Sequence, residues 1–137
     1  MSVKELTLEA KVANLQQVLD FVDENLKSMR CPMKILMQID VAVEEIFVNV
    51  ASYAYALDTG SVTIRMDLLE NPRTVVITFI DSGIPYNPLA KADPDVTLSA
   101  EEREIGGLGI MMVRKTMDDM TYEYRDGQNI LTIFKHI

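Results

Sequence analysis

The stretch VAVEEIFVNVASYAY, residues 41–55, decides the fold. Its apolar side chains recur every three or four residues, which is the spacing of one face of an α-helix. Glu45 and Asn49 are four residues apart, so on that helix one lies a turn above the other. Each directly precedes one of these apolar residues, and we therefore expect both at the edge of the buried face. A carboxylate and a carboxamide there cost free energy unless a polar group meets them.

The helix around this stretch is predicted to extend over residues 34–56, a length of about 34 Å at 1.5 Å per residue. Before it, alternation predicts a strand over residues 3–10, and a change to helical spacing predicts an amphipathic helix over residues 11–26. After it, two β-branched or alternating runs, residues 62–68 and 74–80, predict an antiparallel hairpin.

The character of the chain changes in residues 81–107, which contain three of the five prolines and little apolar periodicity. A segment of this length in a compact domain is usually functional or disordered. A short helix follows it, then a strand around residues 122–124 and a last strand over residues 129–137. The sequence thus predicts one domain over residues 1–137 with an α+β fold. We expect a two-layer α/β sandwich, with a mainly antiparallel sheet and helices packed on one face.

Composition excludes several classes of protein. An apolar fraction of 48%, with 25% charged residues, is ordinary for a globular protein. The net charge of −8 and the absence of a Lys/Arg cluster argue against a nucleic-acid interface, and no apolar run approaches the length of about 18 residues that a membrane span needs. One cysteine, Cys31, cannot form an internal disulfide, and without a secretory signal we expect a cytoplasmic protein.

Glu45 and Asn49 have a possible chemical role. A carboxylate can orient or deprotonate an attacking hydroxyl or water, and an asparagine carbonyl one turn away can be a hard oxygen ligand for Mg²⁺. The alternative is an ordinary solvated edge of the helix, because Glu-x-x-x-Asn is a weak pattern by itself.

Asp81-Ser82-Gly83 follows the second strand of the predicted hairpin. A carboxylate at a strand end can accept a hydrogen bond from an exocyclic amine such as that of adenine, and Gly83 would allow the backbone to approach closely. The alternative is a plain turn, for which these three residue types are also suited.

Gly106-Gly107-Leu108-Gly109 opens the short helix. Glycines at a helix N-terminus expose backbone N–H groups, and the helix dipole favours anions there. The alternative is a flexible hinge. The motif is not a P-loop, because no Gly-Lys-Ser/Thr follows, and it is not a dinucleotide fingerprint, because no strand directly precedes it.

The order of these motifs is more specific than any one of them. Glu-x-x-x-Asn on a helix, a hairpin ending in Asp-x-Gly, a long irregular segment and a glycine-rich helix start resemble the Bergerat ATP-binding fold of the GHKL superfamily (gyrase, heat-shock chaperones, histidine kinases and mismatch-repair ATPases). Within it the chain is most similar to the stand-alone anti-sigma-factor serine-protein kinases of bacteria. The resemblance covers residues 5–135, nearly the whole chain.

The resemblance implies a role for each motif. Glu45 matches the general base, Asn49 the Mg²⁺ ligand, Asp81 the aspartate that reads adenine, and Gly83 the glycine two residues further on. Residues 89–105 correspond to a mobile ATP lid. Thr132 is a looser match to a polar residue on the last strand that supports the adenine site. The glycine box that holds the phosphates corresponds to Gly106, Gly107, Leu108 and Gly109.

The chain also departs from the family pattern. Tyr53-Ala54-Tyr55 stands where the kinases often have His-Gly or His-Ala before a tyrosine, and no second glycine follows closely behind Gly83. Tyr86 stands where the family has phenylalanine, and we expect it to anchor the loop on the core. These departures leave the specificity for the protein substrate open.

The resemblance implies an ATP- and Mg²⁺-dependent serine-protein kinase. Its substrate would be a STAS-domain anti-anti-sigma protein, and it would also sequester a sigma factor, usually as a homodimer. The alternative is a nucleotide-gated binding module with little kinase activity, although such a module could dispense with Glu45. A detached histidine-kinase domain is a further alternative, but no predicted helix contains the phosphoacceptor histidine that it would need.

Overall fold

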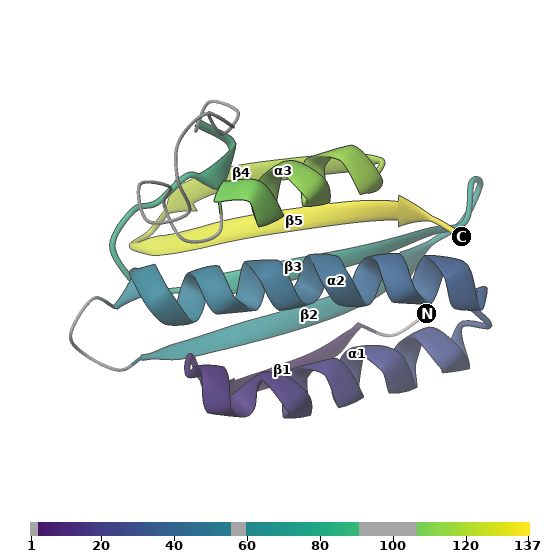
Figure 1. Ribbon diagram of the computed structural model, residues 1–137, viewed down its shortest axis with the longest axis horizontal. Helices are drawn as coiled ribbons and strands as arrows, with labels where there is room; N and C mark the ends of the chain where they lie inside the picture. The colour runs from purple at the N-terminus through teal and green to yellow at the C-terminus, as the bar shows by residue number, and fades with distance from the viewer. Residues whose placement is uncertain (1–2, 56–59, 91–106) are drawn as a thin grey trace.

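The computed structural model describes residues 3–55, 60–90 and 107–137. Within these residues, five strands form one sheet in the order β1-β2-β3-β5-β4, and each neighbouring pair is antiparallel. The strands are β1 (Lys4–Glu9), β2 (Ser61–Leu69), β3 (Thr74–Asp81), β4 (Asp119–Arg125) and β5 (Gln128–His136). The helices α1 (Leu15–Ser28), α2 (Met33–Asn49) and α3 (Gly107–Thr116) lie on one face of this sheet (Figure 1). The predicted α+β sandwich is confirmed, and none of its described helices is long and apolar enough to span a membrane.

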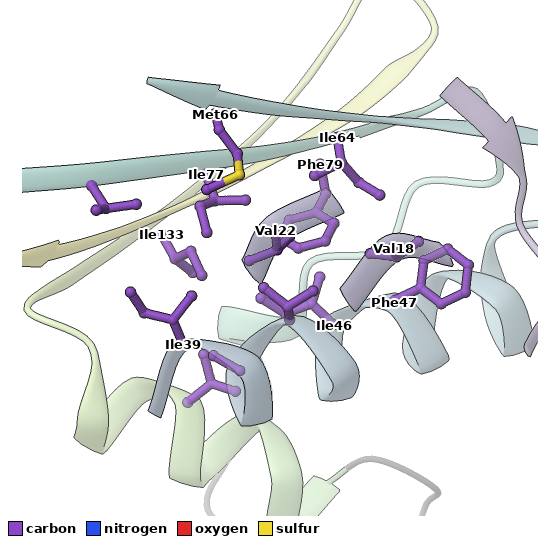
Figure 2. Close-up of a cluster of buried hydrophobic side chains, with 14 of the residues drawn as sticks. Val18, Val22, Ile39, Ile46, Phe47, Ile64, Met66, Ile77, Phe79 and Ile133 are labelled. Carbon is purple, nitrogen blue, oxygen red and sulfur yellow. The ribbon is translucent and has the colours of Figure 1, made fainter. Parts of the chain in front are cut away.

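The core lies between the helices and the sheet. Every second residue of β2 is buried, as the alternation of apolar and polar side chains requires. Each large apolar side chain that is fully buried contributes about 1.5–3 kcal/mol. Figure 2 shows the centre of this core, where α1 and α2 meet three strands through Val18, Val22, Ile39, Ile46, Phe47, Ile64, Met66, Ile77, Phe79 and Ile133. This packing determines which face of α2 is turned toward the sheet.

The C-terminal end of α2 differs from the prediction. The α-helix ends at Asn49, and a π-helical turn, η2 (Val50–Ala54), continues it. The carbonyl of Ala54 accepts a hydrogen bond from the backbone N–H of Ile84 at 2.7 Å, so this end of the helix is tied to the residues after β3. Such π-helical turns are frequent at functional sites.

A pair of carboxyl groups lies between α1 and α2. The Oδ1 atoms of Asp23 and Asp40 are both buried, and neither accepts a hydrogen bond from a described group other than the facing carboxyl. The pKa of Asp40 is raised to about 7, first by burial and then by the hydrogen bond to Asp23 and the charge of Asp23. The charge of Lys27 lowers this pKa, and the charge of Glu44 raises it. Because a hydrogen bond between two carboxyls needs a proton, the pair shares one at pH values below about 7.

Candidate functional site

A cavity lies between the end of α2, the strands β3 and β5, and the residues that follow β3. Its walls are mostly apolar and a few polar side chains converge on it, which is the usual character of a small-molecule site. The lining residues are Ile46, Asn49, Val50, Tyr53, Ala54, Phe79, Asp81, Tyr86, Pro88, Ile110, Tyr122, Asn129 and Leu131. Asn49 and Asp81, two of the residues predicted for the site, are therefore brought together here.

Asn49 is the polar residue on the buried face of α2. Its side chain is 5% exposed, and neither its Oδ1 nor its Nδ2 atom has a hydrogen-bond partner among the described residues. A buried polar group without a partner costs about 1–3 kcal/mol, and such groups are rare in native proteins. The carboxamide is thus available to a polar group that enters the cavity.

Asp81 is the last residue of β3 and is also buried. Its Oδ1 atom accepts hydrogen bonds from the backbone N–H of Gly83 and from Nδ2 of Asn129, each at 2.9 Å. Gly83 lies directly against the backbone of Ala54, and a Cβ atom at this position would collide with the Ala54 carbonyl. Glycine is therefore required where the turn after β3 meets the end of α2.

Asn129 is a site residue that the sequence did not reveal. It faces Asp81 across the β3–β5 ladder, and its Nδ2 atom also donates to the carbonyl of Ile84 at 2.9 Å. Its Oδ1 atom accepts from the backbone N–H of Tyr86 and from the hydroxyl of Tyr122. Burial raises the pKa of Tyr122, which keeps this donor protonated. Asn129 could have been found from its position in the sequence, because it follows the same alternation as the apolar residues of β5 and therefore points to the same inward side.

Thr132 is not brought into the site. On β5 the buried residues Leu131 and Ile133 point toward the helices, so Thr132 points to the opposite face of the sheet. There its Oγ1 atom lies 3.3 Å from that of Thr78 on β3. The polar side chain that β5 contributes to the cavity is Asn129, and the prediction for Thr132 is corrected accordingly.

Two tyrosines stack at the wall of the cavity. The ring centroids of Tyr53 and Tyr86 are 5.4 Å apart, and the rings are inclined by only 13°. Tyr86 therefore packs against Tyr53 at the π-helical end of α2, whereas the sequence predicted packing on the core. Tyr55 has a different role, because its hydroxyl donates to the carbonyl of Ser61 at 2.6 Å and accepts from the N–H of Ser82 at 2.8 Å. Tyr53 and Tyr55, which depart from the family pattern, thus both connect the end of α2 to neighbouring segments.

Glu45 lies one turn before Asn49 and is half-buried. Its carboxylate occupies the space above Gly109 in the first turn of α3, where a Cβ atom would collide with Oε2. The structure therefore brings Glu45 against one glycine of the predicted glycine box. Gly107 and Leu108 also lie in this first turn of α3.

Part of the predicted site lies outside the described residues. Gly106 belongs to this part, and so does the predicted lid from residue 91 onward. Of the lid, the structure describes the first residues, where Pro88–Ala90 form a short 3₁₀ turn.

These features define a class of protein: a two-layer sandwich in which a helix, the end of a central strand and a glycine-rich helix start surround a cavity of small-molecule character. A family model described as the histidine kinase-like ATPase domain matches residues 8–135. The chain belongs to this family, and the predicted relationship is confirmed.

Several relatives carry more specific names. The chain is 26% identical to the serine/threonine-protein kinase BtrW of Bordetella bronchiseptica, over 99% of this chain and 96% of BtrW. It is 27% identical to the serine-protein kinase RsbW of Bacillus mycoides, over 66% of this chain and 58% of RsbW. It is 29% identical to the anti-sigma F factor of Caldanaerobacter subterraneus, over 70% of this chain and 66% of that factor.

A solved structure has the same fold. The RsbU and RsbW domains of Rv1364c from Mycobacterium tuberculosis superpose with a TM-score of 0.71 at 17% identity, over 99% of this chain and 32% of that chain.

Proposed function

We propose that this protein binds ATP together with Mg²⁺ in the cavity and transfers the γ-phosphoryl group to a serine of a STAS-domain protein. The observation that carries the proposal is Asn49, a buried carboxamide on the apolar face of α2 without a hydrogen-bond partner among the described residues. A ligand that meets this carboxamide would remove a cost of about 1–3 kcal/mol. The relatives named as serine-protein kinases and as an anti-sigma factor support the same assignment.

Asp81 is the group proposed to read the base. Both of its hydrogen bonds from the described residues end on Oδ1, so Oδ2 can accept from the exocyclic amine of adenine. Guanine carries a carbonyl oxygen at the corresponding position, which would meet a carboxylate with repulsion. We therefore expect ATP to bind in preference to GTP.

Asn49 suits Mg²⁺ as its ligand from the protein. Mg²⁺ commonly keeps several waters and binds through substrate phosphates and one or two protein oxygens, rather than through a protein cage. In the part of the chain that the structure describes, no group of three or more His, Cys, Asp or Glu side chains could hold a metal ion. The buried, unpartnered Oδ1 atom of Asn49 fits this mode of binding. When bound, the ion would neutralise charge on the phosphate oxygens.

Glu45 is the proposed general base. Its carboxylate is held above Gly109, one turn of α2 from Asn49. It would accept the proton of the serine hydroxyl while the serine oxygen bonds to the γ-phosphorus and the bond to ADP breaks. The proposed role requires that the carboxylate be ionised before transfer.

The phosphates are assigned to the start of α3. The proposed contacts are the backbone N–H groups of Gly106, Gly107, Leu108 and Gly109, because a helix N-terminus favours anions. Residues 89–105 would close over the nucleotide as the lid, and residues 1–137 would act as one domain. The proposal includes sequestration of a sigma factor and assembly as a homodimer.

The test is incubation of the protein with γ-labelled ATP and the STAS-domain protein encoded nearest its gene. We expect label on a serine of that protein, loss of label with Glu45→Ala at unchanged ATP affinity, and loss of ATP binding with Asp81→Asn. ATP binding without any transfer would replace the kinase by the nucleotide-gated binding module. A wild-type protein that does not bind ATP would refute both.

A further inference from the structure

A groove runs between α2 and α3 on the outer side of the helical layer. It offers about 230 Å³ of open space. Figure 1 shows the two helices side by side and running in opposite directions. The lining residues are Met37, Gln38, Val41 and Ala42 of α2 and Met112, Val113 and Thr116 of α3. The groove is separate from the lining of the candidate nucleotide cavity.

The groove exposes large apolar side chains. Met37 is 61% exposed, Val41 46% and Met112 52%, and Met33, one turn before Met37, is 63% exposed. Of the nine large apolar side chains exposed in the described part of the chain, three therefore line the groove and a fourth, Met33, lies one turn further along α2. Contiguous apolar surface of this kind marks interaction sites, and methionine adapts its shape to a partner.

One end of the groove meets the proposed catalytic carboxylate. Glu45 lies one turn after Val41 on the same side of α2, and Gly109 lies one turn before Met112 on α3. The carboxylate of Glu45 sits directly against Gly109, which closes the groove at this end.

The other end carries positive charge. Lys34 lies one turn before Met37 and Gln38 on the groove side of α2, and it is exposed. The N-terminus of α2 adds its dipole there, since Pro32 provides no side-chain cap and the first turn contains no acidic residue. Lys34 and the helix dipole therefore favour a negatively charged group at this end of the groove.

We infer that this groove docks a helical segment of the protein substrate whose serine is presented to Glu45. The inference rests on the proposed kinase function. The segment would place apolar side chains, spaced one turn apart, between α2 and α3, as amphipathic helices do in such grooves. It would carry carboxylates about 16 Å from the serine, because Lys34 and Glu45 are eleven residues apart on α2. The charged end would set the direction in which the segment binds, and the apolar side chains at the floor of the groove would supply affinity.

The first test is phosphotransfer kinetics with the STAS-domain protein encoded nearest the gene. We expect Met37→Glu, Val41→Glu and Lys34→Glu each to raise KM for the protein substrate about tenfold or more. The kcat and the Kd for ATP should stay unchanged, because these residues lie outside the nucleotide cavity. Val12→Glu is the matched control, since Val12 is 55% exposed and precedes α1, and it should leave KM unchanged.

The second test does not depend on transfer. With methyl-¹³C methionine, the signals of Met37 and Met112 should shift when a serine-to-alanine form of the same STAS protein is added. The buried methionines Met29, Met66 and Met117 serve as internal references.

The outcomes separate the two proposals. Wild-type transfer with an unchanged KM in the groove variants and unshifted methyl signals would overturn the docking groove and leave the kinase intact. Shifted methyl signals without transfer would refute the kinase, and with it the presentation of a serine to Glu45, and would leave the groove as a binding surface only. Shifts that depend on the concentration of this protein alone would assign the groove to a second copy and overturn the inference.

Discussion

Asn49, Asp81 and Asn129 are three buried polar side chains around one cavity, and their hydrogen bonding differs. Asp81 and Asn129 bond to each other and to neighbouring backbone groups, so their orientations are determined by the fold itself. Asn49 has no such partner among the described residues. The site thus combines a prearranged pair with one group that gains its partner only from a ligand.

Replacement of Asn49 by leucine tests this difference. Leucine has a similar size and removes the unpartnered carboxamide, so we expect the free energy of unfolding to rise by about 1–3 kcal/mol without nucleotide. Mg²⁺-dependent ATP binding should be lost in the same variant. Thermal unfolding and calorimetric titration measure the two effects. A less stable variant that still binds ATP normally would contradict the proposed role.

Asn129→Ala tests the positioning of Asp81. The substitution removes the side-chain donor to the Asp81 carboxylate and leaves the Tyr122 hydroxyl without its acceptor. We expect affinity for ATP to fall about tenfold, which corresponds to about 1.4 kcal/mol. Thr132→Val is the matched control on the same strand, since Thr132 points to the other face of the sheet. Equal effects of both variants would show that β5 matters only for general stability.

The helix α2 combines a structural and a functional face within one element. Its buried stripe packs on the sheet, its end forms the cavity wall, and its contact with α1 contains the Asp23–Asp40 pair. The position of Glu45 and Asn49 therefore depends on how α2 is held between its neighbours.

The carboxyl pair predicts a pH dependence of stability. The pKa of Asp40 is about 7 in the folded protein, above its value of about 4 in an unfolded chain. Between these values the folded state binds more protons, so stability falls as pH rises from about 4 to 7 and then levels. Asp40→Asn should flatten this part of a Tm–pH profile. Glu24→Gln, an exposed change on α1, is the control, and an unchanged slope in Asp40→Asn would exclude the pair as its origin.

At the scale of the whole molecule, the cavity is assembled from segments that are far apart in the sequence. It takes residues from α2, β3, α3, β4 and β5, so it exists only in the folded chain. A ligand that binds only this state stabilises the fold by mass action.

Nucleotide should therefore raise Tm. At one hundred times its Kd, ATP with Mg²⁺ should add about 2.7 kcal/mol, a shift of several degrees for a domain of this size. GTP should give a smaller shift, and Asp81→Asn should give none. Scanning calorimetry measures all three, and equal shifts with ATP and GTP would exclude Asp81 as the group that selects the base.

The sequence predicted most of the fold because its periodic signals agree with the packing. The alternation in β2 and the stripe of α2 correspond to the buried faces that the structure shows. The π-helical turn was not predicted, and the residues that contact it, Gly83 and Ile84, approach it only in the tertiary structure. For β5, a looser match to the family predicted Thr132 as the site residue. The alternation with Leu131 instead places Asn129 on the inward face of the strand. The catalytic and binding roles stay predictions.

The hydrogen bond between Asp81 and Asn129 bears on where residues can be inserted into this chain. Asp81 ends β3 and Asn129 is the second residue of β5, and the chain between them includes α3 and β4, which returns to the sheet beside β5. The closure entropy of such an excursion grows slowly, by about 0.6 kcal/mol for each doubling of its length. Insertions after Ala90 should therefore alter Tm little, which a series of Gly-Ser insertions would measure. Length added after Ala90 would lie between β3 and α3, and the described strands would keep their register because each is paired with its neighbours along its length.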